Sequence, residues 1–215
     1  MEIIIKIILS YLLGAFSGSM LIGKIKKVDI RKMGSGNAGG TNAFRTMGLT
    51  FAIGVIAIDI LKGYIAVEFI PYLNLESIFI KTDIINLKYL PVACSIGVVL
   101  GHVYPIYYKF KGGKGAGTMI GVLASLFPNA LYICLLVWVV ILILTGYVGL
   151  STIIAGCILP ICTIFFYPNG LDSPFGFFSI IIATFIIYTH RGNIHRILIK
   201  KENRFEKIML FRKRK

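Results

Sequence analysis

The chain has 215 residues, of which 57% are apolar and only 15% are charged, and its mean hydropathy is +0.84. Soluble domains average about 45–50% apolar and about 25% charged residues, so this composition excludes an ordinary soluble enzyme and an intrinsically disordered chain. The four cysteines lie inside apolar runs without CxxC spacing, so neither a disulfide framework nor a zinc site is expected.

Seven apolar segments approach the length of about 20 residues that a membrane-spanning helix needs. In chain order they are residues 3–23, 49–71, 88–105, 115–128, 129–148, 150–168 and 175–190. The fourth segment is short, and only Pro128-Asn129 separates it from the fifth, so six crossings are the alternative. The sequence therefore predicts an all-α polytopic membrane protein with seven transmembrane helices, forming one domain over residues 1–215.

The basic residues predict the orientation of these helices. The net charge is +14, and residues 24–48, 106–114 and 191–215 together hold 19 of the 23 Lys and Arg. These three regions fall on one side if the seven helices alternate. The positive-inside rule then places the N-terminus outside and the C-terminus in the cytoplasm, and the charge requires no nucleic-acid partner.

A cleavable signal peptide is the alternative interpretation of the first segment, because Ser17-Gly18-Ser19 ends it with small residues. Cleavage there would carry the six basic residues of 24–48 across the membrane, against the positive-inside rule. The segment is therefore interpreted as the first helix.

The first inner region, residues 33–48, combines five glycines with hydroxyl groups, two asparagines and Arg45. Glycines let backbone N–H groups approach an oxyanion, and the planar arginine side chain suits phosphate. A flexible linker is the alternative, but a linker needs neither Arg45 nor the asparagines. This region is predicted to cradle an anion.

The second inner region contains Gly112-Gly113-Lys114-Gly115 directly before an apolar segment, which would place free helical N–H groups beside a lysine. It is not a Walker A motif, because that motif requires Ser or Thr after the lysine, where this chain has Gly115. The motif therefore gives no support to nucleotide hydrolysis.

The third inner region places His190 and Asn193 three residues apart, on one helical face that Arg196 continues. By itself, this region would be explained by a structural histidine and by arginines that anchor a helix end. Three such regions on one side of the membrane favour an anion-binding site instead.

Asp59 and Lys62 lie inside the second apolar segment. A charge near the membrane centre costs about 2.5–3.5 kcal/mol on insertion scales, so both side chains are expected to face protein and to pair with each other. They are interpreted as a structural pair, two and a half turns or more from the inner regions.

Together these regions resemble the signature segments of the bacterial integral-membrane acyl-phosphate:glycerol-3-phosphate acyltransferase family. The matching stretches are Gly34-Ser35-Gly36-Asn37 through Thr41-Asn42 and Arg45, Gly101-His102 through Pro105 and Phe110 to Gly115, His190-Arg191 through Asn193-Ile194 and Arg196, and Asp59 with Lys62-Gly63. The resemblance spans almost the whole chain.

The resemblance implies transfer of a fatty acyl group from acyl phosphate to the 1-hydroxyl of glycerol 3-phosphate, which gives lysophosphatidic acid and phosphate. It implies a bacterial plasma-membrane protein with a cytoplasmic active site, membrane lipid as a partner, and functional coupling to the enzyme that makes acyl phosphate. The implied catalytic residues are Arg45, Lys114, His190 and Asn193. The implied substrate-binding or phosphate-binding residues are Ser35, Gly36, Asn37, Thr41, Asn42, His102, Gly112, Gly113, Gly115 and Thr152.

The chain departs from the family pattern after the fifth segment. Gly146 and Gly149 stand where family members commonly have an arginine and the first of two serines, and Thr152 keeps a hydroxyl at the position of the second. Ser151 is the substitute candidate for that hydroxyl contact.

The sequence favours direct attack of the glycerol hydroxyl without an acyl-enzyme. Acyl phosphate is a mixed anhydride with phosphate as leaving group, so no cofactor or metal is expected. No histidine is followed five positions later by aspartate, and no Gly-x-Ser-x-Gly motif is present. A phosphate oxygen of a substrate or His190 would accept the proton.

A transporter or channel for an organic phosphate is the alternative function. Transporters commonly place their site near the membrane midplane on broken helices, often within internal repeats. The sequence shows no repeat, and the charges well inside its apolar segments are few, with Lys6 in the first segment and Asp59, Lys62 and Glu68 in the second.

Overall fold

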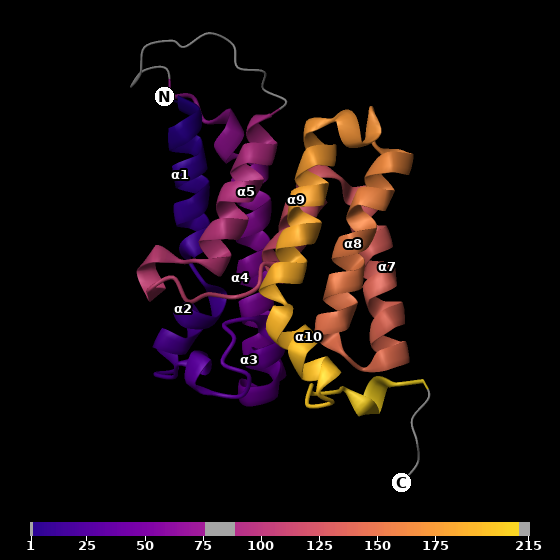
Figure 1. Cartoon of the computed structure of the whole chain (residues 1–215). Coiled ribbons are helices and arrows are strands. Elements are labelled where there is room, and N and C mark those ends of the chain that lie inside the picture. The colour runs from indigo at the N-terminus through magenta and orange to yellow at the C-terminus, as the bar shows by residue number, and fades with distance from the viewer. Residues whose placement is uncertain (1, 76–88, 211–215) are drawn as a thin grey trace. The chain divides into compact units, whose positions relative to one another are not determined.

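The computed structural model describes residues 2–75 and 89–210, and every long regular element in these ranges is a helix (Figure 1). The described residues form two compact units, residues 1–127 and 128–215. The basic residues after 210, which the orientation prediction counted, lie outside the described residues.

The first unit contains α1 (Glu2–Ala15), α2 (Gly18–Ile25), α3 (Gly40–Met47), α4 (Leu49–Glu68), α5 (Leu90–Val103) and α6 (Ala116–Leu126). Short 3-10 helices cover Ile30–Lys32, Ile70–Tyr72 and Ile106–Tyr108. The second unit contains α7 (Pro128–Thr145), α8 (Val148–Phe166), α9 (Pro174–Thr189) and α10 (Arg191–Leu198), with 3-10 helices at Gly170–Asp172 and Glu206–Ile208.

Each of the seven predicted segments contains a helix, and the boundary at Pro128-Asn129 is confirmed because α7 begins at Pro128. Within the described residues, four helical spans are long and apolar enough to cross a membrane: Leu49–Tyr72, Leu90–Tyr108, Pro128–Thr145 and Val148–Phe166. The count rises to six if the bent pairs α1–α2 (44°) and α9–α10 (52°) each form one span. At 11 residues, α6 is too short to span a bilayer as a straight helix.

The two helix pairs that build the first unit, α1 with α5 and α4 with α6, meet at glycines. A side chain at Gly101 would collide with the backbone of Tyr11, and one at Gly97 would lie 2.8 Å from the carbonyl oxygen of Ile7. Small residues allow such close approach, and dense packing replaces the hydrophobic driving force that is absent between helices in lipid.

Close packing at glycines also joins α4 to α6. Side chains at Gly63 and Gly121 would collide with the backbones of Thr118 and Ile60 respectively. This packing fixes the start of α6, and therefore the glycine-rich segment that precedes it, against the middle of α4.

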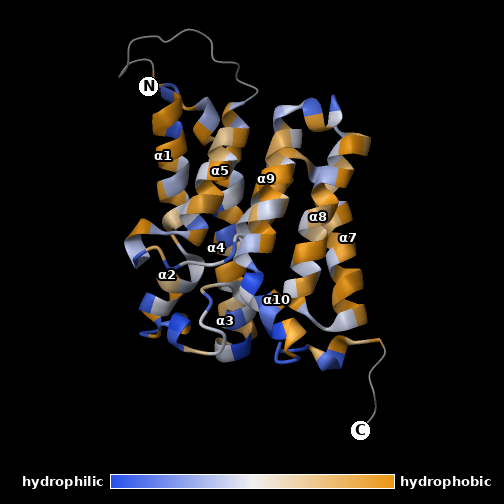
Figure 2. Ribbon diagram, viewed as in Figure 1, coloured by the Kyte–Doolittle hydropathy of each residue, from blue (hydrophilic) through white to orange (hydrophobic). Residues whose placement is uncertain are grey.

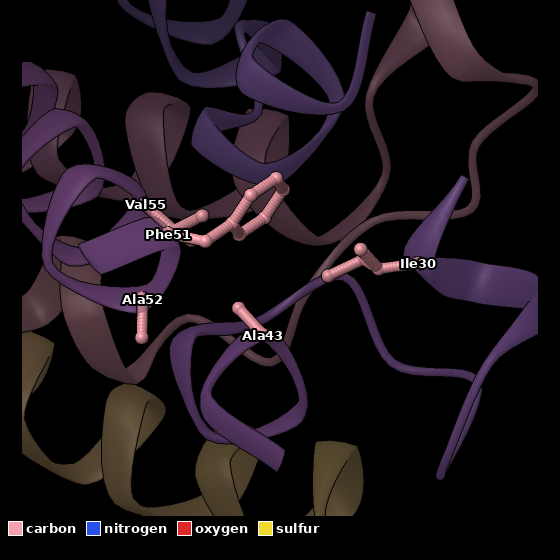
Figure 3. Close-up of a cluster of buried hydrophobic side chains, with 5 residues drawn as sticks. All are labelled: Ile30, Ala43, Phe51, Ala52 and Val55. Carbon is pink, nitrogen blue, oxygen red and sulfur yellow. The ribbon is translucent and has the colours of Figure 1, made fainter. Parts of the chain in front are cut away.

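The polar end of the first unit is held by a small apolar core (Figure 3). Ile30 and Ala43 pack there against three side chains of α4, which are Phe51, Ala52 and Val55. All five are at most 7% exposed. This core attaches α3 and the segment before it to α4.

Within each unit, apolar and polar residues are distributed as expected for a membrane protein. The long helices are mostly apolar, whereas polar residues gather at α3 in the first unit and at α10 in the second (Figure 2). Helix α7 exposes large apolar side chains such as Tyr132 (68%) and Leu136 (65%), a surface suited to lipid.

We expect Gly121→Val to destabilise the protein by about 1–3 kcal/mol, because the added side chain collides with the backbone of α4. The measurement is thermal unfolding of the purified protein in detergent. Ala57→Val, on the exposed face of α4, is the matched control and should leave the unfolding temperature unchanged. Equal unfolding temperatures for both variants would contradict the glycine-mediated contact.

Candidate active site

The first loop, residues 33–40, is organised by one buried side chain. The Oδ1 atom of Asn42 accepts a hydrogen bond from the backbone N–H of Ser35 at 2.9 Å. Its Nδ2 group donates to three carbonyl oxygens, those of Ile30, Met33 and Asn37, at 2.9–3.0 Å. The side chain is 1% exposed, so its amide is occupied in holding the loop. Direct phosphate contact by Asn42 stays a prediction.

The other predicted residues of this region are accessible. Ser35 and Gly36 are exposed, and Asn37, Thr41 and Arg45 are half-buried. Thr41 and Arg45 are four residues apart on α3 and therefore share one face of it. This part of the chain presents a hydroxyl, glycine backbone and a guanidinium, a suitable donor set for an anion.

The second loop, residues 109–115, is bonded to the end of α5. The backbone N–H of Gly112 donates to the carbonyl of Val103 at 3.1 Å, and that of Gly113 to the carbonyl of His102 at 3.1 Å. Lys114 is half-buried, and Gly115 adopts a left-handed conformation (φ 92°) directly before α6. The loop therefore delivers a lysine to a helix start whose first N–H groups have no intrahelical acceptor.

His102 itself is 2% exposed, with its Nδ1 atom 3.4 Å from Oδ1 of Asp59. The sequence predicted the pairing of Asp59 with Lys62, and this is confirmed by an Nζ–Oδ1 distance of 2.9 Å. The expectation that this pair lies apart from the inner regions is wrong. His102, at the end of α5 and directly beside the second loop, lies against the pair because α5 packs on α4.

Arg31 lies in the 3-10 helix Ile30–Lys32, directly before the first loop, and connects this segment to the second loop within the first unit. Its Nη1 group donates to the carbonyl of Tyr108 at 3.1 Å and to that of Lys111 at 3.4 Å. Its Nε and Nη2 groups donate to the two carboxylate oxygens of Asp29 at 3.0 and 2.8 Å. The hydrogen bond from Arg31 lowers the pKa of Asp29 and raises that of Arg31, so both remain charged at neutral pH.

In the second unit, His190 lies at the bend between α9 and α10 and is 4% exposed. Its Nδ1–H group donates to the carbonyl of Ile186 at 2.9 Å. In the neutral imidazole, this bond leaves the lone pair on Nε2, the nitrogen suited to accept a proton.

Asn193, one turn further along, is held by a carboxylate that the sequence interpretation missed. Its Nδ2 group donates to Oε1 of Glu202 at 2.9 Å, and Oε2 of Glu202 accepts from Nε of Arg196 at 2.6 Å. The basic tail contains two glutamates, Glu202 and Glu206, and no spacing rule connects either of them to Asn193.

Gly149 and Gly146, where the chain differs from the family pattern, both lie next to functional or tail residues of the second unit. A side chain at Gly149 would lie 2.7 Å from Nδ2 of Asn193, so a serine there would displace that amide. The backbone carbonyl of Gly146 accepts from the N–H of Phe205 at 2.9 Å. Arg204 donates to the carbonyl of Thr145 at 3.1 Å, so the tail is bonded to the turn between α7 and α8.

Thr152 and Ser151 use their hydroxyl groups internally. The Oγ1–H of Thr152 donates to the carbonyl of Val148 at 3.0 Å, and its oxygen accepts from Nε1 of Trp138 at 3.2 Å. Ser151 donates to the carbonyl of Tyr147 at 2.9 Å. Substrate contact by Thr152 stays a prediction.

A metal site finds no support in the described residues, which contain no group of three or more His, Cys, Asp and Glu side chains able to share an ion. The polar groups that the described site residues present for binding a substrate are hydroxyl, amide, imidazole, cationic and backbone N–H groups.

Comparison with known proteins decides the family. A family model described as glycerol-3-phosphate acyltransferase matches residues 4–200. The chain belongs to this family. Three similar proteins carry the name glycerol-3-phosphate acyltransferase. The protein of Fusobacterium nucleatum is 36% identical and covers 93% of this chain and 96% of its own length. The Aquifex aeolicus protein is 37% identical (95% and 100%), and that of Bacillus subtilis is 39% identical (94% and 97%).

Two solved structures share the fold. Both are crystal structures of PlsY, described as an integral membrane glycerol 3-phosphate acyltransferase. The glycerol 3-phosphate form has a TM-score of 0.81 at 34% identity, and the lysophosphatidic acid form has 0.79 at 33%. Each comparison covers 95% of this chain and 96% of the other. The predicted family and the assignment to the membrane are therefore confirmed.

We expect Asn42→Ala to loosen the first loop, because it removes four hydrogen bonds and leaves buried carbonyl groups without a donor. Each unsatisfied buried group costs about 1–3 kcal/mol, so the unfolding temperature in detergent should fall clearly. Asn129→Ala, at an exposed position of α7, is the matched control. An unchanged unfolding temperature in Asn42→Ala would show that this side chain does not hold the loop.

Proposed function

We propose that this protein transfers a fatty acyl group from acyl phosphate to the 1-hydroxyl of glycerol 3-phosphate, giving lysophosphatidic acid and phosphate. The observation that carries the proposal is that Arg31, directly before the first glycine-rich loop, bonds to Lys111 of the second, since a reaction between two phosphate-bearing substrates needs two anion sites close together. Family membership and the names of the similar proteins support the acceptor.

In the proposed reaction, the hydroxyl oxygen of glycerol 3-phosphate attacks the acyl carbonyl carbon. The bond between that carbon and the phosphate oxygen breaks, and inorganic phosphate leaves. The loops contribute by orienting both substrates and by stabilising negative charge. Arg45 and Lys114 supply cations, and Ser35, Gly36, Asn37, Thr41 and the glycines of the second loop supply hydrogen-bond donors.

The proton of the hydroxyl has two candidate acceptors. One is a phosphate oxygen of a substrate, and the other is Nε2 of His190, whose Nδ1–H is already committed to Ile186. Asn193, held by Glu202, is assigned a polar contact in the same reaction. The proposal keeps residues 1–215 as one acyltransferase domain.

The proposed topology has seven crossings, an outside N-terminus and a cytoplasmic C-terminus in the bacterial plasma membrane. It requires the 11-residue helix α6 to cross together with the residues that flank it. The basic regions 24–48, 106–114 and 191–215 support a cytoplasmic active site, because each carries site residues or lies beside them. A cytoplasmic site also gives direct access to soluble glycerol 3-phosphate and to an enzyme that supplies acyl phosphate.

The test is incubation of purified protein in detergent with acyl phosphate and labelled glycerol 3-phosphate. We expect lysophosphatidic acid to form, and we expect Arg45→Ala and Lys114→Ala to reduce its rate by about ten to over a hundredfold, the value of a charged contact made in the transition state. Lys24→Ala, an exposed lysine on α2, is the control and should retain activity.

Three outcomes would contradict the proposal. Absence of product from wild-type protein without a sealed compartment would favour an organic-phosphate transporter, and product from acyl-CoA alone would overturn the donor. Normal rates for Arg45→Ala and Lys114→Ala at low and saturating substrate would overturn the assigned loops.

Direct attack predicts that no residue of the chain becomes acylated. Intact mass after incubation with acyl phosphate alone should equal that of the untreated protein, because the candidate site hydroxyls of Ser151 and Thr152 donate to backbone carbonyl oxygens and not to an activating base. An added acyl mass that disappears when glycerol 3-phosphate is supplied would establish a two-step mechanism instead.

A further inference from the structure

Asp59, Lys62 and His102, here called the Asp59 cluster, form a buried group of titratable side chains that the proposed chemistry does not use. Their exposed fractions are 2%, 3% and 2%. The carboxylate oxygen Oδ1 of Asp59 lies 2.9 Å from Nζ of Lys62 and 3.4 Å from Nδ1 of His102, and it accepts from the backbone N–H of Gly18 at 3.2 Å. One oxygen atom therefore gathers groups from α2, α4 and α5.

The cluster lies at the break between α1 and α2. A break frees backbone groups that must find partners inside the protein where water is scarce. Lys62 donates to the carbonyl oxygen of Phe16 at 2.9 Å, and Asp59 accepts from Gly18, the first residue of α2. The two charges thus satisfy both ends of the break.

The start of α2 is bonded in turn to the first loop. Ser19, the second residue of α2, donates its hydroxyl to the carbonyl oxygen of Ala38 at 3.0 Å, and Ser17 lies 3.1 Å from that hydroxyl. Ser17, Ser19 and Ala38 are fully buried, so movement of the α2 start is transmitted to residues 33–40.

His102 connects the cluster to the second loop. Its carbonyl oxygen accepts from the N–H of Gly113, and a side chain at Gly113 would collide with Nε2 of its ring. The imidazole therefore lies directly beneath the loop that carries Lys114. Gly117, in the first turn of α6, also rests on Asp59, since a side chain there would lie 3.2 Å from the Cβ atom of Asp59.

We propose that the Asp59 cluster is a positioning device that fixes the first and second loops relative to each other. His102 acts through Gly113 as a positioning residue, in place of the direct substrate contact that the family resemblance implies. The inference rests on the proposed function, because its kinetic consequence is a changed affinity for a phosphate-bearing substrate. A purely structural cap of the helix break would lower stability without changing substrate affinity.

The test compares His102→Ala, His102→Gln and Asp59→Asn with wild-type protein in the detergent assay. We expect His102→Ala to raise the KM of at least one substrate about tenfold with a smaller change in kcat, the pattern of a lost binding geometry. His102→Gln, which refills the space beneath Gly113 and keeps a polar side chain, should recover part of that loss. His195→Ala, an exposed histidine on α10, is the matched control and should keep the wild-type KM.

A double-mutant cycle tests whether Asp59 and His102 act together. Asp59→Asn should raise KM in wild-type protein and add little in the His102→Ala background, because both changes act through the same contact. Unchanged KM values in folded variants, or fully additive effects, would overturn the proposal. If Asp59→Asn does not fold, the comparison of His102→Ala with His102→Gln still decides it.

A second measurement does not depend on enzyme activity. Lys109 and Lys111 are exposed in the second loop, so trypsin should cleave there faster in His102→Ala than in wild-type protein. Cleavage at the exposed residues Lys200 and Lys201 of the tail is the internal control and should not change. Unchanged cleavage of the second loop would overturn the positioning role, whereas an inactive wild-type protein with faster loop cleavage would contradict only the proposed function.

Discussion

The first unit depends on how a broken helix satisfies its backbone in a membrane. Helix α1 ends at Ala15 and α2 begins at Gly18, so a carbonyl and an N–H group lose their helical partners where lipid offers no replacement. The Asp59–Lys62 pair supplies one charge to each group. Burying two charges is costly, and the cost is offset because each charge has both its opposite and a backbone partner.

Glycine contacts make this arrangement possible. They let the backbones of α1 and α5, and those of α4 and α6, come into direct contact. This close packing places His102 beneath the second loop and Gly117 against Asp59. Arg31, directly before the first loop, bonds to the second loop from the accessible side. The second unit uses a comparable principle on a smaller scale, since Glu202 fixes Asn193 from the basic tail. In both units, a carboxylate with several donors holds residues that the family motifs contain.

The sequence was sufficient for features that follow from local chemistry. Hydropathy located all seven helical segments, and the cost of isolated charges in lipid predicted that Asp59 and Lys62 would pair. It was insufficient where the partner is a backbone group or lies far along the chain. The role of Asn42 depends on three carbonyl groups that exist only in the folded loop, and Glu202 meets Asn193 only because the tail turns back.

The most direct test of this account is hydrogen–deuterium exchange on wild-type protein and the Asp59→Asn variant in detergent. The account predicts faster exchange in both loops, residues 33–40 and 109–115, because each is bonded to groups that the Asp59 cluster fixes, while exchange in α8 and α9 stays at the wild-type rate. Wild-type exchange in both loops of a folded Asp59→Asn variant would contradict it, as would equal acceleration in every helix.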